Sequence, residues 1–351
     1  MHQACDILAR CTRSAPNLRS VNISISATPL PPGESSDGMP NLKFIFQNAP
    51  QLKSITWTSN TFPSSLPSQI SELTITLLPY PFGPTSVLWL LEVLANLPSL
   101  KNLTLTIPVT FSEVILFPRE QTPPFLLSRL ESLTVQSYPD FNNILLYIQT
   151  PNLSRLHLRS SEPPLNHPHA ATGASLCRFI ESISPPLELL ELYDVDLPRG
   201  DFIRCFLGLP TLQELRLHET EISDDVFALI AELDGPCPQL RRLDLRWCEQ
   251  LSGSCLVNLI SARNVACDIA HSNPALRRIE EITLVNCALV KERDVLDLAK
   301  ATVCSVIARS PDDYCRFRGC CNNGRYRQRL RLRHKKDLES AEGGGMRLIL
   351  D

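Results

Sequence analysis

Side chains suited to recognition recur in the second half of the chain. Arginine, histidine and tyrosine stand at fixed offsets from pairs of leucines, and arginine and tyrosine are favoured where proteins bind partners. We therefore expect a protein ligand to contact these side chains through charge-assisted hydrogen bonds and aromatic packing. The alternative is that they simply keep an exposed surface soluble. The residues are Arg155, His157, Arg159, Tyr193, Arg216, His218, Arg242 and Arg246.

Spacings that would indicate catalysis are absent from the sequence. It contains no G-x-S-x-G nucleophile motif, no phosphate-binding G-x-x-x-x-G-K-[S/T] loop, no G-x-G-x-x-G and no H-E-x-x-H. His218-Glu219 begins like the zinc motif, but Ile222 stands where the second histidine would be. Four residues near the C-terminus lack the paired C-x-x-C spacing of a zinc site: Cys315, Cys320, Cys321 and His334. We expect no enzyme activity, no catalytic residues, no metal and no cofactor.

A repeated leucine pattern must position the recognition side chains. The pattern L-x-x-L-x-L, with Ile, Val or Trp tolerated, occurs ten times at a mean spacing of about 29 residues. A proline often precedes it by two residues. The copies begin at Leu18, Leu52, Ile70, Leu100, Leu130, Leu153, Leu187, Leu212, Leu240 and Ile279.

The alternation within L-x-L predicts a strand with two buried leucines and one exposed residue between them. One such strand cannot bury its apolar face alone, so successive units must stack in parallel, with return segments that are usually helices. We expect helices after Ser223, after Ser252, after Asp201, from Asn41, and over SVLWLLEVLANL before Pro98. The fold class is therefore α/β: a curved solenoid with parallel strands on its concave face and helices and loops on its convex face.

The exposed strand positions change character near residue 150. Earlier strands present threonine between and after the leucines, which suits strand propensity and needs no partner. Later strands present Arg, His and Tyr together with Glu191, Glu214 and Asp244. The later strands are thus the predicted docking surface.

These features resemble leucine-rich-repeat proteins. Residues 236–260, PCPQLRRLDLRWCEQLSGSCLVNLI, are similar to the cysteine-containing repeats of F-box proteins, with Cys237, Leu243, Cys248 and Leu251 at matching places. The resemblance covers roughly residues 15–300, and irregular repeats with Pro-rich loops are similar to fungal F-box-like proteins. It implies the substrate-recognition region of an F-box-type ubiquitin ligase receptor. We see no F-box module here, so a cullin-ligase adaptor is expected only if one lies upstream.

Composition bounds the remaining partners. Apolar residues make up 43% of the chain, which fits a folded protein. The net charge of −3 gives no overall positive potential that would attract nucleic acid. We see no signal peptide or membrane span, and expect a cytoplasmic or nuclear location. Residues 1–310 form the predicted solenoid, and 311–351 a basic, disordered tail with nine Lys or Arg in 315–336. A free-standing scaffold or inhibitor, and a nuclear or RNA-associated protein that uses the tail, remain the alternatives.

Overall fold

The chain divides into two compact units. Unit 1 comprises Met1–Ser161 and Ala174–Leu187, and unit 2 comprises Glu162–Gly173 and Glu188–Asp351. The computed structural model describes residues 15–25, 42–59, 65–78, 85–107, 115–116, 123–137, 139–160, 170–232, 234–248, 250–269 and 276–307. The predicted tail, residues 311–351, lies outside the described residues, so its boundary stays a prediction.

Parallel strands in uniform register make up the sheet of unit 1, in the order β1-β2-β3-β5-β8-β10. In Ser54–Ser59 (β2), Glu72–Leu77 (β3), Ser132–Ser137 (β8) and Arg155–Ser160 (β10) every second residue is buried, as the L-x-L alternation predicts. The strands are Ser20–Ser24 (β1), Ser54–Ser59 (β2), Glu72–Leu77 (β3), Asn102–Thr106 (β5), Ser132–Ser137 (β8) and Arg155–Ser160 (β10). Two short parallel pairs accompany them: Thr85–Ser86 (β4) with Ile115–Leu116 (β6), and Phe125–Leu126 (β7) with Ile148–Gln149 (β9). The described helices are Leu42–Ile45 (α2), Val87–Ala95 (α3), the 3-10 helix Pro139–Tyr147 (η2) and Ala170–Ile183 (α4), which crosses the unit boundary.

Unit 2 repeats the arrangement with a helix of at least eight residues between each pair of consecutive strands. Its strands pair in parallel in the order β11-β12-β13-β14-β15. They are Leu189–Tyr193 (β11), Glu214–His218 (β12), Arg242–Arg246 (β13), Glu281–Val285 (β14) and Val303–Ile307 (β15). The helices are Arg199–Leu207 (α5), Asp224–Ala231 (α6), Gly253–Ile269 (α7) and Glu292–Ala301 (α8).

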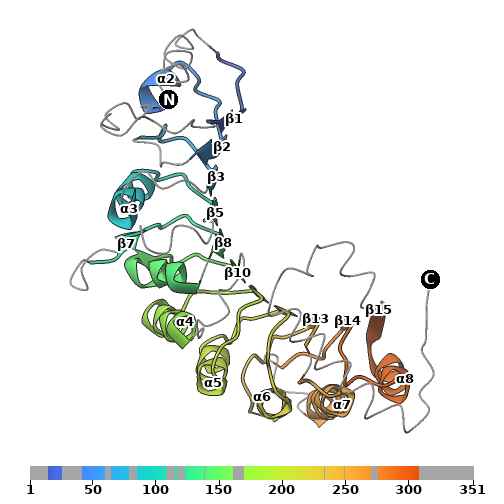
Figure 1. Cartoon of the computed structure of the whole chain (residues 1–351). Helices are drawn as coiled ribbons and strands as arrows, with labels where there is room; N and C mark the ends of the chain where they lie inside the picture. Colours follow the sequence, from blue (N-terminus) through green and yellow to red (C-terminus); the bar gives the residue numbers. More distant parts are fainter. Residues whose placement is uncertain are drawn as a thin grey trace. The chain divides into compact units, whose positions relative to one another are not determined.

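Within each unit the helices lie along one side of the strands (Figure 1). The pattern leucines fill the layer between them: Leu215, Leu243 and Leu245 are at most 1% exposed. Burial of each such side chain contributes about 1.5–3 kcal/mol. The opposite side of each sheet therefore carries the residues between the leucines, which is the leucine-rich-repeat arrangement that the sequence predicts.

The strands of the two units end differently. In unit 1, most strands run on for a sixth residue whose side chain is buried, as at Ser59 and Ser137. In unit 2 the residue at that position turns the chain out of the sheet through a left-handed conformation, with φ between 53° and 59°. The four turn residues are Asp194, Glu219, Trp247 and Asn286.

The ten predicted strands are all present, and the predicted helices before Pro98 and after Ser223 and Ser252 are confirmed. The helix expected after Asp201 begins earlier, at Arg199, because Pro198 fixes the backbone at its start and Asp201 lies in its first turn. An eleventh strand, β15, was not predicted, since its sequence VCSVI lacks the leucine three residues upstream. Among the described helices, none is both long enough and apolar enough to cross a membrane.

Candidate interaction surface

The predicted recognition residues divide between the two units. Arg155, His157 and Arg159 alternate along β10 in unit 1, beside Ser132, Thr134 and Gln136 of β8. The other five predicted residues lie in unit 2 on three neighbouring strands. The three residues of β10 belong to unit 1 and are described apart from the cluster of unit 2.

In unit 2, polar side chains at matching strand positions form what we call the charged face. Strand register places Arg216 between Glu191 and Asp244, and His218 between Tyr193 and Arg246. A third row pairs Glu214 with Arg242. The charged face consists of Glu191, Tyr193, Glu214, Arg216, His218, Arg242, Asp244 and Arg246.

Glu214 bridges two arginines on the charged face. One carboxylate oxygen, Oε1, accepts from Nε of Arg216 at 2.5 Å, and the other, Oε2, lies 2.9 Å from Nη2 of Arg242. Nη1 of Arg216 also lies 3.6 Å from the carboxylate of Glu191, whose side chain is only 3% exposed. The two arginines are therefore held in fixed positions by acids from their own and adjacent strands.

Asp244 organises the other half of the charged face. Arg246 donates from Nε and Nη2 to the two Asp244 oxygens, both at 2.8 Å, and Nε2 of His218 lies 3.5 Å from Oδ2. Burial alone would raise the pKa of Asp244, but the interactions with His218 and Arg246 hold that pKa well below its ordinary value of 3.8. The Tyr193 ring packs edge-on against His218, with ring centroids 5.8 Å apart.

The turns after the strands fix the backbone under the charged face. The Glu219 amide donates to the Arg246 carbonyl at 2.6 Å, and the Trp247 amide donates to the Val285 carbonyl at 2.8 Å. The buried Cys248 thiol reaches back to the Leu217 carbonyl at 3.2 Å. Each strand end is thus tied to its neighbours. The interaction with Cys287, together with burial, raises the pKa of the Cys248 thiol, so the thiol stays protonated.

A buried arginine supports the same strands from the helical side. Arg263 of α7 is 1% exposed, and its guanidinium donates to the carbonyls of Ile230, Pro236, Cys237 and Pro238 at 3.0–3.3 Å. These carbonyls end α6 and form the segment that leads into β13. Arg263 therefore fixes where β13 begins.

The sequence placed Glu191, Glu214 and Asp244 on this face but did not select them as site residues. The structure shows that they neutralise and orient the arginines that were selected. Opposite charges at matching offsets from the leucines were the available signal, because residues at matching offsets on neighbouring parallel strands lie about 4.8 Å apart.

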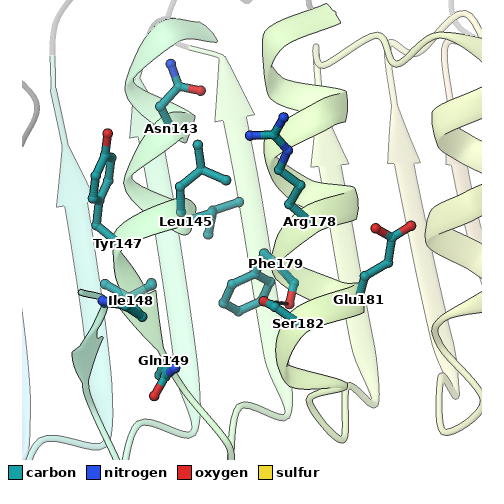
Figure 2. Close-up of a pocket in the computed structure, with 11 residues that line it drawn as sticks. Asn143, Leu145, Tyr147, Ile148, Gln149, Arg178, Phe179, Glu181 and Ser182 are labelled. Carbon is teal, nitrogen blue, oxygen red and sulfur yellow. Dashed lines mark hydrogen bonds between the residues drawn. The ribbon is translucent and has the colours of Figure 1, made fainter. Parts of the chain in front are cut away.

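Unit 1 offers a different surface. Its strands present rows of threonine, such as Thr56, Thr74, Thr104 and Thr134, which are in register and half-exposed. On the helical side, a groove of about 960 Å³ lies between η2, β9 and α4, with Phe179 directed toward Ile148 (Figure 2). Arg178 and Glu181 are its charged lining residues. The Ser182 hydroxyl in the lining donates to the Phe179 carbonyl at 3.2 Å, and no histidine or second acid lines the groove beside it.

The described residues also test the metal hypothesis in part. They contain no group of three or more His, Cys, Asp or Glu side chains arranged to hold a metal ion. The set Cys315, Cys320, Cys321 and His334 lies outside the described residues. The cysteines that are described are free thiols.

Neither a family model nor a curated protein matches this sequence. Among solved structures, actin-binding site 2 of Leiomodin-1 is 13% identical, covering 47% of this chain and 95% of that one, with a TM-score of 0.29. A chain from the crystal structure of the yeast Rad7 and Elc1 complex is 17% identical, covering 75% and 82%, with a TM-score of 0.32. Values this low carry no functional argument, and the fold stands on the strand order and register described above.

Proposed function

We propose that this chain is a non-enzymatic protein-interaction module and that a protein partner docks on the charged face of unit 2. The observation that supports the proposal is the ordered array of arginine, tyrosine and histidine on three adjacent strands. Arginine and tyrosine dominate binding hot spots because they offer large contact areas and directed hydrogen bonds. Side chains already held in place lose little entropy on binding.

The finer proposal is that the chain is the substrate-recognition region of an F-box-type ubiquitin ligase receptor. It rests on the resemblance of residues 236–260 to cysteine-containing repeats. If the finer proposal holds, a cullin-ligase adaptor will be recovered together with the protein when it is affinity-purified from its own cells. Partners recovered with no adaptor would instead indicate a free-standing scaffold or inhibitor.

The docking surface is tested by quantitative affinity purification. We expect the double variant Arg216→Glu, Arg242→Glu to lose the partners of the wild-type chain, because it adds two carboxylates to the three already on the face. Tyr193→Ala is a variant that changes no charge. The circular dichroism spectrum of each variant is measured first to confirm that it is folded. The control exchanges an exposed ion pair of unit 1, Lys101→Glu with Glu131→Lys, whose atoms lie 2.6 Å apart. Unchanged binding by folded charged-face variants would remove this face as the docking surface.

A further inference from the structure

The charged face is layered, with acids beneath and arginines above. The side chains of Glu191, Glu214 and Asp244 are 3%, 13% and 18% exposed, whereas those of Arg216, Arg242 and Arg246 are 35%, 54% and 45% exposed. A ligand that approaches the sheet therefore meets guanidinium groups first. The carboxylates that orient these groups are largely withdrawn from solvent.

The arginines keep unused hydrogen-bonding capacity. A guanidinium has five N–H donors in a planar fork. Arg242 and Arg246 each meet their acid through Nε and Nη2. Their Nη1 amino groups remain to donate, and the fork is already oriented by the acid below. Such a group matches a carboxylate of a partner in a fixed plane.

Charge balance decides between anionic partners. Three arginines and three carboxylates make up the charged groups of the face apart from His218, and the exposed Glu281 of β14 lies in register beside Arg242, so the face has no excess of positive charge and its long-range field is weak. A polyanion such as nucleic acid binds to uncompensated positive charge and releases its counterions on binding. This face offers no such uncompensated charge. Individual carboxylates of a protein segment need only the local, directed donors that are present.

We propose that the partner presents Asp or Glu carboxylates to Arg242 and Arg246, in a short acidic segment that lies along β13. The inference rests on the proposed function and specifies its partner chemistry. The proposed recognition does not depend on long-range electrostatic attraction, and salt mainly screens such long-range fields. We therefore expect that raising the salt from 50 to 150 mM lowers the association rate less than about threefold.

The test begins with random 16-residue peptides displayed on phage and selected on the full chain. Peptides synthesised from the selected sequences are then measured by fluorescence anisotropy. We expect at least two acidic positions in the binders, and about tenfold weaker binding when those positions become Gln or Asn. Arg242→Gln and Arg246→Gln should each weaken binding by a similar factor. Arg→Lys at these positions should restore it only partly, because lysine lacks the fork.

Arg278→Gln is the matched control. Arg278 is also 54% exposed and also paired with an aspartate, Asp268, but it precedes β14 and lies off the charged face. Its replacement should leave peptide binding unchanged. A double-mutant cycle between an acidic peptide position and Arg242 should show coupling, and none should appear with Arg278.

The possible failures are distinguishable. Peptides that need Tyr193 or Arg242 but no acidic residue would overturn the carboxylate inference and leave the docking function intact. Binding that requires phosphoserine at the acidic positions would also overturn it. Peptides whose affinity no charged-face variant alters would overturn the inference together with the proposed docking surface.

Discussion

The two units build the same strand from the same leucine pattern but surround it with different chemistry. In unit 1 the strand face is threonine-rich, and the buried polar residues that the structure describes there are serines and a threonine: Ser59, Ser137, Thr150, Ser160 and Ser175. In unit 2 the buried residues include Glu191, Asp194, His218, Glu219 and Arg263. All the buried Asp, Glu, His and Arg residues among those described thus belong to unit 2.

This difference distinguishes the residues that the repeat fold requires from the charged residues that it does not require. The strand needs only alternating burial and a parallel neighbour, and neutral threonines satisfy both. Buried charge adds little net stability, because desolvation offsets the attraction between partners. The charges of unit 2 are therefore better explained by positioning of a surface than by stability, and removing single partners should damage unit 2 more than unit 1.

The largest effect is expected from Arg263→Met. Methionine fills a similar volume but leaves four carbonyls without their donor, so we expect unit 2 to lose about 3 kcal/mol of unfolding free energy. Hydrogen exchange followed by mass spectrometry resolves the two units, and protection should fall in α6, α7 and β13 but not in unit 1. Arg178→Met, an exposed arginine of unit 1, is the control. A loss below about 1 kcal/mol would mean that the buried guanidinium contributes little.

Arg216→Ala should lower the stability of unit 2 by about 2 kcal/mol, because the buried Glu191 loses the guanidinium that lies 3.6 Å from its carboxylate. Replacing Glu191 by Gln in the same chain should recover part of the loss, since the less compensated buried charge is gone. The corresponding change in unit 1, Thr104→Ala, removes no charge and should alter stability by at most about 0.5 kcal/mol. Urea titrations of the three variants check this, and equal losses for Arg216→Ala and Thr104→Ala would contradict the comparison.

Asp244→Asn should lower stability in a pH-dependent way. The folded-state pKa of Asp244 is depressed, so its ionised form stabilises the fold above the ordinary value of 3.8, and that contribution is lost as the pH falls further. We expect wild type to exceed Asp244→Asn by about 2 kcal/mol at pH 7, with the difference shrinking below pH 4. Urea unfolding at pH 7, 5, 4 and 3 measures it. A difference independent of pH would show that Asp244 does not act through its charge.

The strands and their exposed positions could be predicted because a strand has only two faces. Once the leucines of L-x-L are buried, the residue between them must face the other way, and a slip of one residue would bury charge. This is why Arg216, His218, Arg242 and Arg246 are on the face that the sequence indicated. Alignment of neighbouring repeats on their leucines also predicts that Glu214 and Arg242 lie side by side.

The strand exits could not be predicted, because no residue type marks them. Asp194, Glu219, Trp247 and Asn286 share a left-handed conformation without sharing chemistry, and none is glycine. After β13 the conformation accompanies a contact of the next residue, where the Cys248 thiol donates to the Leu217 carbonyl. The strand β15 could not be predicted because its sequence lacks the first leucine of the repeat pattern. It is nevertheless paired in register with β14.

The smallest expected effect tests these exits directly. Asn286 holds φ at 53° in unit 2, whereas Ser137 occupies the matching position of unit 1 in an extended strand. Asn286→Val should destabilise by about 1–2 kcal/mol, because a β-branched residue clashes in the left-handed region, and Asn286→Gly should be nearly neutral. Ser137→Gly should instead lose about 1 kcal/mol, because glycine weakens an extended strand. Thermal unfolding with hydrogen exchange separates the cases. If glycine had the same effect at both positions, the two exits would not differ in backbone strain, and the contrast between the units would reduce to side-chain charge.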